Sequence, residues 1–177
     1  MLISDEYRQI QSDLHESNPN YGVASQQFAP LVAKIVRETN PKELLDYGAG
    51  KGRLGIALNE ILSSHVEIHH YDPAIPHWAS RPAPCEFVCC IDVLEHVEPK
   101  LLGNVLDDLQ RVTSYLGFYT VHTGAAVKVL SDGRNAHLLQ RPAKWWLPHI
   151  MERFELNQFQ RTPNGFWVVV QKLISSD

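Results

Sequence analysis

A glycine-rich segment follows the first short apolar run of the chain. Residues 44–55 read LLDYGAGKGRLG, with glycines at positions 48, 50 and 52. Glycines at alternate positions after a strand let the backbone turn sharply and approach a ligand, because a Cβ there would collide with it. Asp46 places a carboxylate at the end of that strand, beside the loop. We therefore predict a ligand-binding loop at residues 48–52.

A second carboxylate, Asp72, follows the next predicted strand, twenty positions after Gly52. An adenosine-type ligand requires such a group, which accepts hydrogen bonds from both ribose hydroxyls. Ligands of open α/β sheets bind at the carboxyl ends of the strands, where both acids are expected. The pair Asp46 and Asp72 thus predicts a nucleoside-binding crevice.

The spacing of the glycines separates three ligand classes. A P-loop needs GxxxxGK followed by Ser or Thr, but the Gly-Lys pair at 50–51 is followed by Gly52 and Arg53. A dinucleotide loop needs GxGxxG, and Arg53 occupies its third glycine position. The loop reads GxGxG instead.

With an acidic residue two places before the first glycine, DYGAGKG resembles the S-adenosyl-L-methionine loop of class I, Rossmann-like methyltransferases. Residues 90–97, CIDVLEHV, are similar to the DVLEH segment that ends the fourth strand in many small-molecule members. A C-terminal hairpin matches the family's seventh strand, which lies antiparallel beside the fifth. The resemblance covers about residues 40–175.

The resemblance implies a role for each matching position. The glycine loop and Asp46 would surround the methionine part of S-adenosyl-L-methionine, and Asp72 would hold the ribose hydroxyls. Ile91 and Asp92 would line the pocket near the sulfonium. The implied cofactor site comprises Asp46, Gly48, Ala49, Gly50, Gly52, Asp72, Ile91 and Asp92. Glu95 and His96 would begin the acceptor site.

Two histidines are candidate general bases. His122 ends a predicted strand and His137 lies in the loop after it. Either could take a proton from an acceptor, since imidazole titrates near physiological pH. We also expect Tyr21 to close over the cofactor and Trp145 to face the acceptor.

The remaining histidines and the cysteines predict no metal site. His65, His69, His70 and His149 have no partner at ligand spacing, so we expect them to be structural or surface residues. Cys85, Cys89 and Cys90 include no CxxC pair. They argue against structural zinc and a disulfide framework, and they fit a reducing cytoplasm.

Composition limits the class of protein. The chain has 177 residues, of which 44% are hydrophobic and 20% charged, and this predicts one globular domain. A net charge of −4 makes nucleic acid an unlikely partner. The N-terminus lacks the apolar core of a secretory signal, and no run reaches the roughly 18 apolar residues that span a bilayer. We expect a cytoplasmic protein with no membrane segment.

Hydrophobic periodicity predicts an α/β fold with a mostly parallel sheet, a C-terminal antiparallel hairpin and helices on both faces. An N-terminal helical lid region would occupy residues 1–39 and the α/β core residues 40–177. Ser25 is the expected N-cap of the second helix, and Asn164-Gly165 is the expected hairpin turn. The predicted helices are 5–15, 25–38, 53–63, 99–114 and 142–154; the predicted strands are 43–47, 66–71, 86–91, 117–122, 155–161 and 166–173.

One edge of the sheet should be trimmed. Family members usually have a helix and a further strand between the positions of Asp72 and Asp92, but here only residues 73–91 separate them. Those residues contain four prolines, so a full helix and strand will not fit. Trp78 is a candidate to cover the adenine instead.

The resulting hypothesis is methyl transfer from S-adenosyl-L-methionine to an O, N or C nucleophile of a small-molecule acceptor. One alternative is a cofactor-binding subunit without transfer activity that depends on a partner. Another is an NAD-dependent oxidoreductase. The sequence leaves a homodimer or a protein partner open.

Overall fold

A computed structural model describes residues 1–19, 21–63 and 66–173. The prediction for His65 and the end of the family resemblance, residues 174–175, fall outside these ranges. The helices are α1 (Asp5–Ser17), α2 (Ser25–Thr39), α3 (Arg53–Ile61), α4 (Leu102–Val112) and α5 (Ala143–Met151), and the strands are β1 (Glu43–Tyr47), β2 (Glu67–Tyr71), β3 (Cys85–Cys90), β4 (Thr113–His122), β5 (Phe154–Thr162) and β6 (Gly165–Lys172). Short 3-10 helices are η1 (Pro76–Trp78), η2 (Leu94–His96) and η3 (Pro99–Leu101).

The described strands form one six-stranded sheet in the order β2-β1-β3-β4-β6-β5. The first four strands of the chain are parallel, and β6 runs antiparallel between β4 and β5. The mostly parallel sheet with a C-terminal hairpin is therefore confirmed. So is the trimmed edge, because β2 is the outermost strand and only η1 is present between it and β3.

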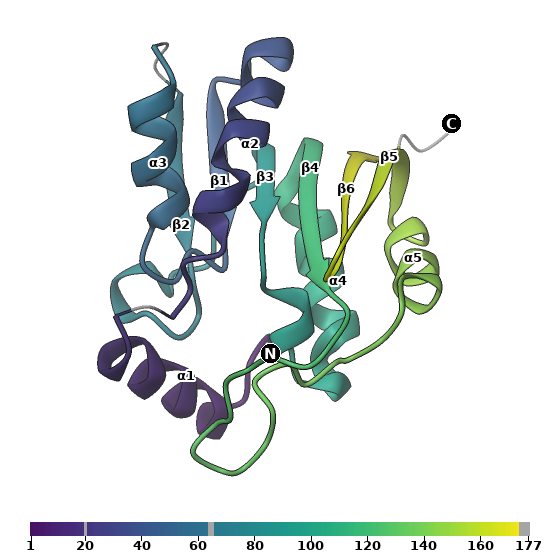
Figure 1. Ribbon diagram of the computed structural model, residues 1–177. Coiled ribbons are helices and arrows are strands. Elements are labelled where there is room, and N and C mark those ends of the chain that lie inside the picture. The colour runs from purple at the N-terminus through teal and green to yellow at the C-terminus, as the bar shows by residue number, and fades with distance from the viewer. Residues whose placement is uncertain (20, 64–65, 174–177) are drawn as a thin grey trace.

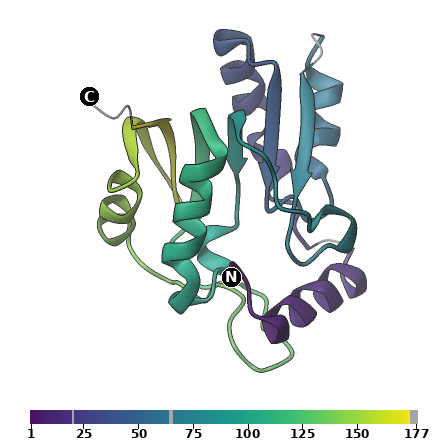
Figure 2. The same ribbon diagram turned by 180° about the vertical axis from the view of Figure 1, so that it is seen from behind.

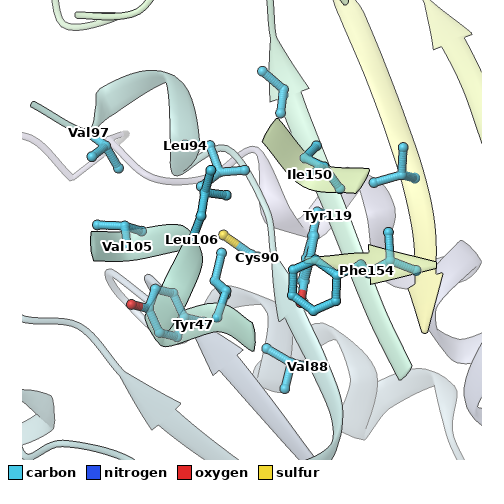
Figure 3. Close-up of a cluster of buried hydrophobic side chains, with 14 of the residues drawn as sticks. Tyr47, Val88, Cys90, Leu94, Val97, Val105, Leu106, Tyr119, Ile150 and Phe154 are labelled. Atoms are coloured by element: carbon cyan, nitrogen blue, oxygen red, sulfur yellow. The ribbon is translucent and has the colours of Figure 1, made fainter. Parts of the chain in front are cut away.

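Helices cover both faces of this sheet (Figures 1 and 2). On one face α2 and α3 pack against Leu44, Phe87 and Cys89. On the other, α4 and α5 pack against the alternate strand positions, among them Val88 and Cys90. Figure 3 shows this second cluster, where Tyr119, Phe154 and Ile150 meet the side chains of α4. Strand residues alternate between faces, so neighbouring apolar residues supply both cores.

A third apolar cluster lies beyond the carboxyl ends of the strands. There α1 and the long loop of residues 123–142 pack together through Tyr7, Leu14, Leu130 and Ala136. By contrast, α2 packs on the sheet face through residues such as Val32. Of the predicted lid region 1–39, only α1 therefore has the position of a lid.

Two local predictions need correction. The helix predicted at 99–114 ends at Val112, because the backbone becomes extended at Thr113, where β4 begins. The Thr113 hydroxyl donates to the Leu109 carbonyl in the last turn at 2.8 Å. Ser25 is the first residue of α2 and not its N-cap; Ala24 holds that position, without a side-chain cap hydrogen bond.

Candidate functional site

A cavity opens where the direction of strand order reverses. From β1 the sheet continues to β2 on one side and to β3 on the other. The loops that follow these three strands line the cavity, and α1 closes it from below the sheet. Ligands of open α/β sheets bind in such a crevice, outside the carboxyl ends at the switch point.

The glycine loop forms one wall, through Gly48, Ala49 and Gly50. All three glycines of the loop have positive φ, between 53° and 81°, a region that other residues rarely adopt. A Cβ on Gly48 would collide with Val93, and one on Gly50 would lie 2.9 Å from His15 Cε1. The glycines thus let the loop backbone pack closely against Val93 and His15 at the cavity wall.

Asp72 ties the second strand to this loop. Its Oδ2 accepts a hydrogen bond from Gly50 N at 2.9 Å, and its Oδ1 accepts one from Ala74 N at 2.9 Å. The side chain lines the cavity although the residue is only 7% exposed. A carboxylate has about four acceptor positions, so this one can accept further hydrogen bonds from a ligand hydroxyl.

Asp46 lies beneath the loop and does not line the cavity. Its Oδ2 lies 3.7 Å from His70 Nδ1 on β2 and has no hydrogen-bond partner among the described residues. Burial raises the pKa of Asp46, while His70 acts in the opposite direction. The structure thus brings Asp72, Gly48 and Gly50 to the cavity but leaves Asp46 buried beside His70.

The far end of the loop is also outside the cavity. Gly52 begins α3 and faces Trp78, since a Cβ on it would lie 2.8 Å from that indole. Trp78 stacks on His70, with ring centroids 4.6 Å apart. Neither Gly52 nor Trp78 lines the cavity, so the expected indole cover for an adenine is not at the cavity wall.

The third wall comes from the end of β3, where Ile91 and Asp92 line the cavity. Asp92 has φ of 59°, which is uncommon for a residue with a side chain. Its N–H donates to Thr120 Oγ1 at 3.0 Å and so helps to hold this conformation. Backbone strain of this kind collects at functional sites.

Behind Asp92 lies a fully buried acid. Glu95 has 0% exposure, and its Oε1 accepts from His122 N at 2.5 Å. Its Oε2 has no hydrogen-bond partner among the described residues. Burial raises the pKa of Glu95 well above its usual range, and the neighbouring Asp92 carboxylate raises it further.

Three predicted histidines form a cluster beside these acids. The His137 ring centroid lies 4.7 Å from that of His96 and 4.6 Å from that of His122. Of the three, only His96 lines the cavity. Burial lowers the pKa of His96 to about 4. The fold thus brings together His96, predicted at the acceptor site, and the two candidate bases His122 and His137, which are far apart in the chain.

The inner face of α1 carries residues that sequence reasoning missed. Tyr7, Gln11 and His15 line the cavity, and their spacing of four places them on one helix face. Hydrogen bonds run from Tyr21 to Gln11 at 3.0 Å, from Gln11 to Tyr7 at 2.6 Å, and from Tyr7 to the His96 carbonyl at 2.8 Å. Tyr21 lines the cavity, as expected. Their i, i+4, i+8 spacing in the sequence could have shown that these polar residues share one face of the helix.

Trp145 is not at the site. It lies on α5 against Trp146 and His149, and it does not line the cavity. Its neighbour Trp146 is fully buried in the core.

Fold and site together define an α/β protein with a cavity at the switch point of its sheet. A family model described as "Methyltransferase domain" matches residues 23–163. The chain therefore belongs to this methyltransferase family. A comparison with curated proteins finds no match. No helix among the described residues is long and apolar enough to cross a membrane.

Solved structures with this fold share little sequence with the chain. One is a 1,6-didemethyltoxoflavin-N1-methyltransferase from Burkholderia thailandensis, with 1,6-didemethyltoxoflavin and S-adenosylhomocysteine bound. It has a TM-score of 0.69 and 15% sequence identity, and the match covers 98% of this chain and 92% of that one. An O-methyltransferase family protein from the same organism has a TM-score of 0.64 and 11% identity, and the match covers 86% of this chain and 57% of that one. Magnesium protoporphyrin IX methyltransferase from Synechocystis, with S-adenosylmethionine bound, has a TM-score of 0.60 and 14% identity, and the match covers 85% of this chain and 81% of that one.

Proposed function

We propose that the protein transfers a methyl group from S-adenosylmethionine to an O, N or C nucleophile of a small-molecule acceptor. The observation that carries this proposal is the hydrogen bond between Gly50 N and Asp72 Oδ2, which joins the glycine loop to a cavity-facing carboxylate. Similar structures hold S-adenosylmethionine or S-adenosylhomocysteine, which supports the choice of ligand.

The residues at the cavity fit such a cofactor. The glycine loop brings its backbone to the cavity wall, where the methionine part can contact it, and Asp72 can accept from the ribose hydroxyls. Ile91 and Asp92 would flank the reacting centre. When bound, the cofactor supplies an electrophilic methyl group on a sulfonium.

The chain's own residues would mainly orient the acceptor and exclude water. Transfer needs the nucleophile in line with the bond that breaks, so positioning accounts for much of the acceleration. Tyr21 and His96 line the cavity and would face the acceptor. His122 and His137 are the candidate bases, and His137 contacts both His96 and His122. A base is needed only for an acceptor that arrives protonated.

Calorimetry with S-adenosylmethionine, S-adenosylhomocysteine and NAD tests the proposal. We expect both sulfur ligands to bind. Asp72→Asn should weaken their binding by about 1 to 3 kcal/mol, the cost of stranding hydrogen-bond partners. Glu60→Gln, which removes an exposed carboxylate on α3, is the matched control and should change nothing.

Each contrary result selects another hypothesis. Binding of NAD without S-adenosylhomocysteine would reject methyl transfer in favour of an oxidoreductase. Tight binding without turnover over a broad pool of acceptors would favour the partner-dependent subunit. Unchanged affinity in Asp72→Asn would remove the ribose role of Asp72.

A further inference from the structure

Three potential metal ligands converge beside the cavity. The proposed methyl transfer does not require them to act together. Asp92, His96 and His137 each place one potential ligand atom within 4.8 Å of the other two. They come from the end of β3, from η2 and from the loop before α5. One carboxylate and two imidazoles are a donor set that first-row divalent ions favour.

A backbone carbonyl sets the tautomer of both imidazoles. His96 Nδ1 lies 2.8 Å from the Ala136 carbonyl, and His137 Nδ1 lies 2.8 Å from the Gly124 carbonyl. A carbonyl oxygen only accepts, so each Nδ1 carries the proton and donates it. In the neutral form, each ring then keeps a lone pair on Nε2. Metal-bound histidines commonly show this arrangement, in which a backbone carbonyl sets the tautomer.

A buried acid lies beside the three ligands. Glu95 is completely buried next to Asp92, and its Oε2 has no hydrogen-bond partner among the described residues. None of the ion pairs between described residues includes Asp92 or Glu95. A buried polar oxygen without a partner points to a bound group that the described residues do not supply.

We propose that Asp92, His96 and His137 bind a divalent transition-metal ion, such as Mn²⁺, Fe²⁺, Co²⁺ or Zn²⁺, on the acceptor side of the cavity. Mg²⁺ fits less well, since it prefers all-oxygen ligands. Three protein ligands leave coordination positions open. Because Asp92 and His96 also line the cavity, those positions face the acceptor space.

This placement narrows the acceptor class, a step that rests on the proposed function. The acceptor would offer an oxygen that binds a divalent ion, as a hydroxyl or phenol does. Coordination lowers the pKa of a bound hydroxyl. Its proton then leaves to water, the oxygen forms the bond to the methyl carbon, and the carbon–sulfur bond breaks with its electron pair on sulfur.

Titration of chelator-treated protein with Co²⁺ tests the site without any need for activity. Visible d–d absorption reports coordination, and calorimetry with Mn²⁺ and Zn²⁺ reports stoichiometry. We expect one ion per chain. Asp92→Asn should weaken binding at least tenfold while keeping the backbone, since Asn tolerates positive φ. His137→Gln should do the same, and circular dichroism of both variants checks that they fold.

The matched control is His77→Gln, because His77 is exposed on η1 and outside the cluster. It should change the affinity less than twofold. Absence of an ion at millimolar Co²⁺ would overturn the site. So would unchanged affinity in Asp92→Asn, or the intense near-ultraviolet absorption of thiolate ligation, which would place the ion on cysteine.

Calorimetry with S-adenosylhomocysteine on the same samples separates the two proposals. If it binds but no metal does, the metal site fails and the proposed function stands. If the metal binds at Asp92 and S-adenosylhomocysteine does not bind, the proposed function fails and the site stands.

Discussion

Asp46 and Asp72 carry the same side chain at the ends of neighbouring strands, but their surroundings differ. Asp72 accepts two backbone hydrogen bonds and faces the cavity, whereas Asp46 is sealed beneath the glycine loop with one oxygen unpartnered. A buried carboxylate without full hydrogen bonding favours its neutral form. The two acids therefore differ: Asp72 is available to a ligand, and Asp46 is buried at a cost in stability.

The stability of the protein should reveal that cost. Burial raises the native pKa of Asp46 above its unfolded value, so the native state binds the proton more tightly. Stability from protonated Asp46 is present below the unfolded pKa, about 3.9, and is lost as the pH rises toward the native pKa. Asp46→Asn should therefore gain stability relative to the parent as the pH rises from 4 to 8. The full gain is roughly 1.4 kcal/mol for each tenfold difference between the native and unfolded acid dissociation constants.

Urea unfolding at several pH values measures this difference. Glu60→Gln, on the exposed face of α3, serves as the control and should track the parent at every pH. A difference between Asp46→Asn and the parent that stays constant from pH 4 to 8 would show that the native pKa of Asp46 is not raised.

At the scale of elements, α1 depends on a single residue at its start. Ser4 Oγ accepts from Tyr7 N at 3.2 Å and so caps the helix, and it also donates to Glu98 Oε1 at 2.9 Å. Ser4 N donates to Glu98 Oε2 at 2.8 Å. Glu98 lies just after η2, so these bonds tie the lid to the segment that carries His96.

Ser4→Ala should loosen α1 specifically. Loss of an N-cap costs about 0.5 to 2 kcal/mol, and here the hydroxyl's bond to Glu98 is lost with it. Hydrogen exchange should become faster across residues 5–17 and stay unchanged in β3 and β4. Ser80→Ala, an exposed serine before β3, is the control. Uniformly faster exchange would mean that Ser4 supports the whole fold and not α1 alone.

At the scale of the whole molecule, the cavity joins parts that fold against different cores. The glycine loop leads from β1 into α3 on one face, whereas η2 and α4 belong to the other. The lid adds a third, smaller cluster. A ligand that touches all three parts binds the native state and not the unfolded chain, so it stabilises the whole molecule.

Thermal unfolding measures this linkage. At a concentration one hundred times its dissociation constant, S-adenosylhomocysteine should add about 2.7 kcal/mol. For a chain of this size that corresponds to a rise in Tm of about 5 to 11 °C. Asp72→Asn should show a smaller rise at the same concentration. An equal rise in the parent and the variant would place the ligand away from Asp72.

Much of this protein could be predicted from local sequence. The glycine loop at 48–52, the carboxylate of Asp72 after the next strand and the hairpin at 162–165 all depend on residues close together in the chain, although the turn itself is Pro163-Asn164, since Gly165 is already paired with Thr162. The same is true of the trimmed edge, because four prolines in a short segment leave no room for a helix and strand.

What only the tertiary structure decided concerns contacts between distant segments. Asp46 is directed to His70 and away from the cavity because β1 and β2 are paired in that register. His96 and His137 meet because the loop before α5 folds back over η2, and the carbonyls that orient their rings belong to that loop. No periodicity encodes such a meeting, since it depends on how a long loop packs against α1. The arrangement of groups on the acceptor side is therefore a property of the folded chain.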